Sequence, residues 1–238
     1  MIKQGTVYLV GAGPGDPELI TVRGLKCLRQ ADVVLYDRLI HPDLLEDAPS
    51  WAERIFVGKA PRREAMPQED INQLIVERAL SGQTVVRLKG GDPLVFGRGS
   101  EEAFACAKAG IHCEVVPGIT SAVGVPASAG IPLTHRAVAG SFAVITGHRQ
   151  AGQDDIDRAG LSGIDTLVIL MGVERLPYIV KSLIHQGRLL TTPVAIIERG
   201  TLPDQRVITG SLKDIVLLAD MAQIQPPATI IVGDVVSV

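Results

Sequence analysis

Aromatic residues are scarce in this chain of 238 residues: they make up 3 % of the sequence, whereas hydrophobic residues make up 46 %. The core must therefore be built from Val, Ile, Leu and Ala, and runs of these residues are typical of parallel strands buried on both faces. Proteins that bind single-stranded nucleic acid usually stack bases on aromatic side chains, and few are available here. The formal net charge of −3 gives no global basic field either. We therefore expect no nucleic-acid partner.

Cysteines and long apolar runs are also scarce. Cys27, Cys106 and Cys113 are scattered and form no CxxC pair, which favours buried thiols in a reducing compartment over disulfides. No apolar run approaches the ~20 residues of a membrane span, and the first residues lack the pattern of a signal peptide. The histidines show no metal-ligand spacing. These absences predict a cytoplasmic protein with no membrane segment and no metal.

Short apolar strands alternate with helical patterns along the chain, and this order is typical of parallel β-α units. Apolar residues spaced along one helical face, as in 68–80, mark the helices. Strands are expected at 6–10, 33–36, 54–57, 84–88, 112–116, 142–146, 166–171, 193–198, 206–209 and 229–232, the ninth in hairpin contact with the eighth. Helices are expected at 17–30, 68–80, 100–109, 119–130, 174–185 and 211–218.

The dipeptide Pro117-Gly118 follows the fifth expected strand and is a candidate domain boundary. The sequence therefore predicts two α/β domains. Residues 1–117 should form an N-terminal domain with a mostly parallel sheet, and residues 118–238 a C-terminal domain with a mixed sheet.

Two glycine-rich turns follow apolar strands. The first, GAGPGD at 11–16, places Asp16 where a dinucleotide-binding loop has its last glycine, and a carboxylate there would repel pyrophosphate. It suits a neutral or cationic ligand, and a purely structural turn is equally compatible with the spacing. The second, KGGDP at 89–93, could face the same crevice, because ligands bind at the carboxyl ends of strands in open α/β sheets. By itself Asp92 could equally be a helix cap.

Charged residues gather around these turns. Asp37 follows the second strand directly and Lys59 follows the third, so both are catalytic candidates, although an ordinary ion pair fits as well. The basic residues could be solvated surface or could line a pocket for a polyanion, since arginine binds carboxylates bidentately. They are Arg38, Lys59, Arg62, Arg63, Arg87, Lys89 and Arg98, followed by two His-Arg pairs at 135–136 and 148–149.

Four stretches, 7–40, 85–102, 115–122 and 129–136, contain the motifs GAGPGDP, RLKGGDP with FGRG, PGITSA and GIPLTHR. On these motifs the sequence resembles the uroporphyrinogen-III C-methyltransferases of the tetrapyrrole methylase superfamily. TGH at 146–148 and LMG at 170–172 extend the resemblance over essentially the whole chain. It implies two α/β domains with S-adenosylmethionine in the cleft between them. Residues 1–117 would form the tetrapyrrole side, and residues 118–238 would complete the S-adenosylmethionine site.

The resemblance also implies a reaction and individual roles: methylation of uroporphyrinogen III at C2 and C7 to precorrin-2, by a homodimer. Asp37 and Lys59 match residues proposed as proton acceptor and proton donor. Arg98 and Glu101 match positions near the tetrapyrrole, and Arg98 is also a catalytic candidate. The implied contacts with S-adenosylmethionine are Pro14, Gly90, Gly91, Asp92, Val95, Thr120, Ser121, Met171 and Gly200.

One segment departs from the family pattern. Where the family usually has Arg followed by a Gly/His-rich stretch, this chain has APRREAMPQ at 60–68, and Arg62 and Arg63 could replace the missing cation. Two other functions stay open: a later-acting precorrin methyltransferase that shares GAGPGDP, and a non-catalytic module that binds the cofactor. RLKGGDP and GIPLTHR argue against a relative of diphthine synthase.

Overall fold

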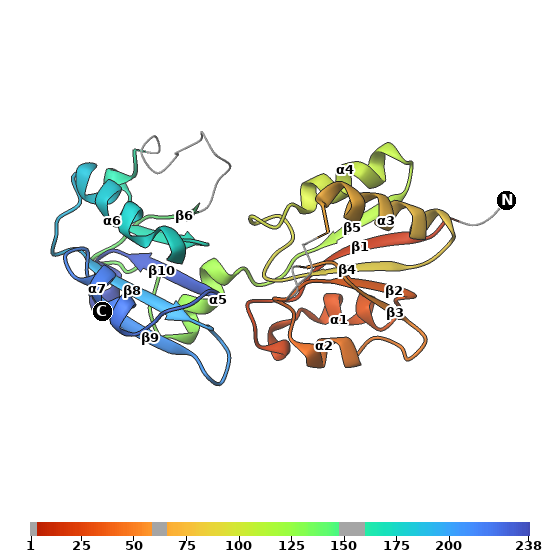
Figure 1. The fold of residues 1–238 in the computed structure, drawn as a ribbon, viewed down its shortest axis with the longest axis horizontal. Helices are drawn as coiled ribbons and strands as arrows, with labels where there is room; N and C mark the ends of the chain where they lie inside the picture. Colours follow the sequence, from red (N-terminus) through yellow and green to blue (C-terminus); the bar gives the residue numbers. More distant parts are fainter. Residues whose placement is uncertain (1–3, 59–65, 148–159) are drawn as a thin grey trace. The chain divides into compact units, whose positions relative to one another are not determined.

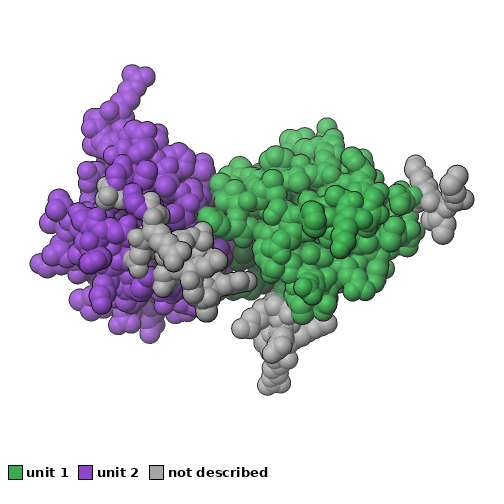
Figure 2. All heavy atoms as spheres, turned by 90° about the horizontal axis from the view of Figure 1, so that it is seen from above, with its two compact units in different colours: residues 1–120 green, residues 121–238 purple. Residues whose placement is uncertain are grey.

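The computed structural model describes residues 4–58, 66–147 and 160–238. These residues form two compact units, 1–120 and 121–238, shown in green and purple in Figure 2. The expected boundary between residues 117 and 118 lies just before the point where the units divide. The functional roles expected for the two halves stay predictions.

The first unit is built on a sheet of five parallel strands. They are β1 (Thr6–Gly11), β2 (Val33–Tyr36), β3 (Glu53–Phe56), β4 (Val85–Lys89) and β5 (His112–Val116), in the order β3-β2-β4-β1-β5. Every pair in this sheet is parallel. All five strands were expected within a residue or so of these bounds, because their aliphatic runs suit burial on both faces.

Helices cover both faces of this sheet (Figure 1). On one face lie α1 (Val22–Leu28) and α2 (Pro42–Glu46), which share an apolar cluster with Val10, Val34 and Leu88. On the other lie α3 (Gln68–Leu80) and α4 (Gly99–Lys108), which pack against Leu9 and Leu35. The alternation along each strand sends successive side chains to opposite clusters.

The helix expected at 17–30 is wrong in its continuity. A short 3₁₀ helix, Pro17–Leu19, is followed by extended backbone at Ile20, and α1 begins only after Thr21. The Thr21 hydroxyl accepts a hydrogen bond from Gly24 N at 3.0 Å, so it caps a new helix start. The short helix α2 was not expected at all.

The second unit contains a mixed sheet of five strands. They are β6 (Phe142–Thr146), β7 (Thr166–Leu170), β8 (Pro193–Glu198), β9 (Arg206–Ser211) and β10 (Ala228–Val232), in the order β6-β7-β10-β8-β9. β6 and β7 are parallel, whereas β10 runs antiparallel to β7 and β8. β8 and β9 form the expected antiparallel hairpin pair. The mixed sheet is therefore confirmed.

Three helices accompany this sheet: α5 (Ser121–Ser128), α6 (Leu176–His185) and α7 (Ile215–Met221). The last was expected to begin at 211, but Asp214 accepts hydrogen bonds from Ser211 N and Oγ at 2.7 and 2.9 Å. That turn delays the helix to Ile215. Within the described ranges, no helix is long and apolar enough to cross a membrane.

Candidate active site

The two glycine turns of the first unit lie directly against each other. Gly91 N donates to Gly13 O at 2.7 Å, and Gly13 N donates to Gly91 O at 3.3 Å. Ala12 N also donates to Lys89 O at 2.8 Å. β1 and β4 are neighbours in a parallel sheet, so the turns that follow them meet at its carboxyl edge. In open α/β sheets this is the edge where ligands bind.

The close approach of these turns depends on missing side chains. A Cβ on Gly11 would lie 2.5 Å from Gly118 Cα, and one on Gly118 would lie 2.3 Å from Gly91 O. Gly13 and Gly91 also have φ angles of +85° and +68°, which glycine adopts without the cost that other residues have. The glycines therefore bring three backbone segments into contact at one edge of the sheet.

The two Gly-Asp-Pro sequences have different structural roles. Asp16 accepts from Glu18 N at 2.9 Å and caps the short 3₁₀ helix. Asp92 caps no helix: its Oδ1 accepts from Leu94 N at 2.8 Å and its Oδ2 from Gly118 N at 3.1 Å. The Asp92 carboxylate thus joins the second glycine turn to the segment that follows β5.

Arg98 and Glu101 form an exposed ion pair at the start of α4. Arg98 Nε and Nη2 each donate to the Glu101 carboxylate at 2.8 Å, and more than half of the Arg98 side chain is exposed. This hydrogen bonding raises the pKa of Arg98 and lowers the pKa of Glu101. Arg98 has a left-handed φ of +59°, as has Phe96 at +52°. Arg98 therefore stands on a constrained turn and Glu101 on the first turn of α4, and both side chains are exposed.

Asp37 follows β2 and is held at both carboxylate oxygens. Oδ1 accepts from Leu39 N at 3.0 Å, and Oδ2 accepts from Arg87 Nη2 at 3.3 Å. The side chain is 24 % exposed, whereas that of Arg87 is 5 % exposed. Asp37 is therefore a carboxylate at the carboxyl edge of the sheet, with its orientation set from inside the unit.

A buried carboxylate that sequence reasoning missed lies behind Arg87. Glu102, on α4, is fully buried and accepts from Arg87 Nε at 3.1 Å and Lys89 Nζ at 3.0 Å. Burial, followed by the nearby Arg87 charge, lowers the pKa of Lys89, and the Glu102 carboxylate opposes that shift. The signal that could have found Glu102 is the strand itself, because two basic residues inside a fully buried strand require a counter-ion.

In the second unit, Met171 and Gly200 occupy equivalent places after β7 and β8. Both strands run antiparallel to β10, so their carboxyl ends lie at the same edge of the sheet. Met171 has a φ of +54° and is about half exposed. A Cβ on Gly200 would lie 2.3 Å from Val125 Cγ1, so α5 packs directly on this turn.

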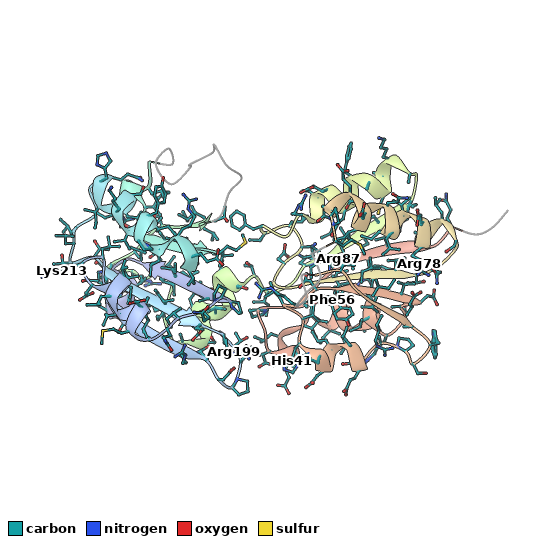
Figure 3. The ribbon with its side chains drawn as sticks, in the orientation of Figure 1. His41, Phe56, Arg78, Arg87, Arg199 and Lys213 are labelled. Carbon is teal, nitrogen blue, oxygen red and sulfur yellow. The ribbon has the colours of Figure 1, made fainter. Side chains whose placement is uncertain are left out.

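The turn around Gly200 is held by the side chain of Gln205. Gln205 Oε1 accepts from Thr201 N at 2.8 Å and from Ser128 Oγ at 2.7 Å. Arg199 and Thr201, on either side of Gly200, have φ angles of +50° and +69° (Arg199 is labelled in Figure 3). The second unit thus presents a constrained turn beside the C-terminal half of α5.

The predicted site residues fall into two groups. At the turns of the first unit lie Pro14, Asp37, Gly90, Gly91, Asp92, Val95, Arg98 and Glu101, with Thr120 at its last position. In the second unit lie Ser121, Met171 and Gly200. Lys59, Arg62, Arg63 and the pair at 148–149 lie outside the described residues. Within the described part of the chain, no group of three or more His, Cys, Asp or Glu could hold a metal ion.

Comparison with known proteins identifies the family. The family model of the tetrapyrrole (corrin/porphyrin) methylases matches residues 6–216. The chain is 52 % identical to the uroporphyrinogen-III C-methyltransferase of Priestia megaterium, over 98 % of this chain and 99 % of that protein. It is 53 % identical to the protein of the same name from Methanocaldococcus jannaschii, over 98 % of each.

A solved structure agrees with these relatives. The uroporphyrin-III C-methyl transferase of Thermus thermophilus, in complex with S-adenosylhomocysteine, superposes with a TM-score of 0.85 at 42 % sequence identity. The superposition covers 98 % of this chain and 99 % of that one. The family model and the solved structure thus agree with each other. The chain is a member of the tetrapyrrole methylase family.

Proposed function

We propose that this protein is a C-methyltransferase that transfers methyl groups from S-adenosylmethionine to C2 and C7 of uroporphyrinogen III, giving precorrin-2. The observation that carries the proposal is the similarity over the full length to two proteins named uroporphyrinogen-III C-methyltransferase, at 52 % and 53 % identity. The complex of the Thermus thermophilus structure with S-adenosylhomocysteine supports the choice of methyl donor.

The chemistry of the turns is compatible with this donor. When bound, S-adenosylmethionine supplies a methyl group on a positively charged sulfur. The glycine turns of the first unit carry the carboxylates of Asp16 and Asp92, whereas the nearest cation on β4, Lys89, is buried. Such a surface suits a cationic ligand better than pyrophosphate. We assign the donor's contacts to Pro14, Gly90, Gly91, Asp92, Val95, Thr120, Ser121, Met171 and Gly200.

The protein's own task is alignment and proton removal. A sulfonium is already a strong alkylating group, so the residues mainly have to hold the reacting carbon in line with the methyl and exclude water. After the new carbon–carbon bond forms, a proton must leave the macrocycle. Asp37 is the base in this proposal, since its carboxylate is partly exposed and held from both sides. Lys59 is the proposed proton donor.

Arg98 and Glu101 are assigned to the tetrapyrrole. The substrate carries several carboxylates, and the exposed Arg98 guanidinium can bind a carboxylate with two parallel hydrogen bonds. Glu101 already occupies one side of that guanidinium, so it orients Arg98 and limits the directions from which a substrate carboxylate can approach.

One assay tests the proposed function. The pure protein is incubated with uroporphyrinogen III and S-adenosylmethionine labelled in its methyl group, and the transferred methyls are counted on a product of measured mass. We expect two methyls per macrocycle. A later-acting precorrin methyltransferase would leave uroporphyrinogen III unchanged and methylate only an already methylated precorrin. A non-catalytic module would bind the donor and yield no methylated product.

We further propose that the protein acts as a homodimer in the cytoplasm and without a metal. The family resemblance supports the homodimer, and the sequence patterns described above support the other two statements. Light scattering on a sizing column measures the mass in solution, and a monomer at assay concentration would contradict the dimer. Turnover should be unchanged after treatment with a chelator. Loss of turnover that added metal restores would contradict the metal-free reaction.

A further inference from the structure

The buried carboxylate of Glu102 has no role in the proposed function as stated so far. Its side chain is 0 % exposed, and it is surrounded by donors from two elements: Arg87 and Lys89 on β4, and Gln68 at the start of α3. Burying charges costs several kcal/mol each, and apolar residues of similar volume often stabilise a protein as well as a buried ion pair. Holding α4 on the sheet is therefore a weak reason for this cluster.

Glu102 fixes one end of the Arg87 side chain. Its Oε1 accepts from Arg87 Nε at 3.1 Å, while Arg87 Nη1 donates to the backbone oxygen of Leu88 at 2.8 Å. The guanidinium group is planar and rigid, so two fixed nitrogens determine the direction of the third. That third nitrogen, Nη2, points at Asp37 Oδ2 at 3.3 Å.

Lys89 and Gln68 in turn fix Glu102. Lys89 Nζ lies 3.0 Å from each carboxylate oxygen of Glu102, and Gln68 Nε2 donates to Oε1 at 3.2 Å. One buried oxygen therefore accepts from three donors. The chain of contacts runs from the interior to the edge of the sheet and ends on the partly exposed carboxylate of Asp37.

We propose that Glu102 is a positioning residue for methyl transfer, and that it acts through Arg87 by fixing the orientation of the Asp37 carboxylate. The inference rests on the proposed function, in which Asp37 removes the proton. It assigns Glu102 a role without any contact to substrate or donor. A displacement of about 1 Å at a reacting group can cost about 100-fold in rate, so an indirect effect of this kind is measurable.

The charge balance indicates which variants can fold. The cluster holds two carboxylates, Asp37 and Glu102, and two cations, Arg87 and Lys89, among the described residues. Glu102→Gln removes one negative charge, but the pKa of Lys89 is already lowered by burial, so the loss of one proton there can restore neutrality. Glu102→Asp keeps the charge but is one methylene shorter, so it cannot reach both β4 cations from α4.

The test compares turnover with donor binding. In Glu102→Gln we expect kcat with uroporphyrinogen III to fall by about 10- to 100-fold. The affinity for S-adenosylhomocysteine, measured by calorimetry, should stay within about 2-fold, since the side-chain partners of Glu102 are Arg87, Lys89 and Gln68, and none of them is an assigned donor contact. Glu102→Asp should also lose turnover, by a smaller factor. A loss of kcat and of donor affinity together, or wild-type kcat in both variants, overturns the inference.

A double-mutant cycle separates positioning from general damage. If Glu102 acts through Asp37, Glu102→Gln should have little further effect on single-turnover rate in an Asp37→Asn background. The same fold-loss in both backgrounds overturns the inference. Where Asp37→Asn is too slow to measure, the comparison of kcat with donor affinity decides.

The matched control is Glu114→Gln. It breaks the exposed Arg23–Glu114 ion pair, in which Arg23 Nη2 donates to the carboxylate at 2.6 and 2.8 Å, and should leave kcat unchanged. Failure of the wild-type protein to methylate uroporphyrinogen III would reject the proposed function itself, before any variant is considered.

Discussion

Replacement of Asp92 tests whether the second glycine turn holds the methyl donor. Its carboxylate accepts from Leu94 N at 2.8 Å and from Gly118 N at 3.1 Å, so Asp92→Ala leaves both backbone donors without their partner. A hydrogen bond contributes about 1 kcal/mol net, and Asp92→Ala should cost the first unit about 2 kcal/mol in free energy of unfolding. The three segments joined at Gly11, Gly91 and Gly118 would then no longer be held in one arrangement.

The loss of about 2 kcal/mol in stability also sets an upper limit on the loss of donor affinity. If the ordered turn is the form that binds, the apparent affinity falls by the fraction of molecules in which that turn is ordered. About 2 kcal/mol corresponds to a loss of up to about 30-fold in the affinity for S-adenosylhomocysteine. Asp92→Asn keeps one acceptor oxygen for two backbone donors. Its affinity for S-adenosylhomocysteine should therefore fall by about 5-fold, which corresponds to the loss of one hydrogen bond.

Calorimetry with S-adenosylhomocysteine and denaturant unfolding measure the two effects separately. The matched control is Asp214→Ala, which removes a carboxylate that accepts from Ser211 N and Oγ in the second unit. It should lower stability and leave affinity unchanged. Wild-type affinity in Asp92→Ala, together with lowered stability, would show that Asp92 shapes a turn that the donor does not use.

Three further predictions follow from the site and its surroundings. Arg98→Ala should cut turnover sharply and leave donor affinity nearly intact, whereas the control Arg23→Ala, at another exposed ion pair, should change neither. Gly200→Ala should lower the free energy of unfolding by about 1–3 kcal/mol, since its Cβ would lie 2.3 Å from Val125 Cγ1. Adding Val125→Ala to the same chain should restore part of that stability. The pKa of Asp165 is lowered, chiefly by its hydrogen bond with Ser141. Its contribution to stability should therefore be present at neutral pH and fade as the pH falls below about 3.8. Asp165→Asn should remove this pH dependence of stability.

Each of these has a contradicting result. Unchanged turnover at saturating uroporphyrinogen III would remove Arg98 from the reaction. Equal stability of the Gly200→Ala and wild-type proteins would mean that α5 can move away from the turn at small cost. Identical acid unfolding curves for the Asp165→Asn and wild-type proteins would show that the denatured chain keeps the same hydrogen bonds.

The fold was predictable where the sequence is periodic. Most strands are short apolar runs, several of them ended by Gly, Asp or Pro, and α3 has its apolar residues on one face, so hydrophobic patterning located them. The same patterning gave the wrong helix start where a single side-chain hydrogen bond sets it. Thr21 caps a new helix start that divides the expected helix, and the Asp214 turn delays α7. Neither hydrogen bond leaves a trace in hydrophobic spacing.

The site was predictable in its position and not in its internal contacts. Glycine turns after neighbouring strands predicted a shared edge, and the structure joins them by paired hydrogen bonds between Gly13 and Gly91. The partner of Arg87 could not be chosen from the sequence, because spacing alone does not distinguish among the 26 acidic residues of the chain. The burial of Glu102 depends on how α4 packs on the sheet. That is a property of tertiary packing.

Backbone conformation adds an independent indication of the ligand-binding turns. Six non-glycine residues in the described ranges have left-handed φ angles, and five of them, Phe96, Arg98, Met171, Arg199 and Thr201, lie in or beside the turns assigned to the substrate or the donor. The sixth, Gln223, follows α7. Residues held in this region cost of order 1 kcal/mol or more each and tend to gather at functional sites.

Met171→Gly tests whether Met171 only turns the chain after β7 or also contacts the donor with its side chain. Glycine relieves the left-handed strain but loses more entropy on folding, so the net change in stability should be small at an exposed position. If Met171 only turns the chain after β7, donor affinity should be unchanged. If its side chain contacts the donor, as we propose, affinity for S-adenosylhomocysteine should fall by about 10-fold, the loss expected for removing one apolar side chain worth ~1.5 kcal/mol. Gln223→Gly, at a φ of +51° and outside the assigned contacts, is the matched control and should bind the donor as the wild type does.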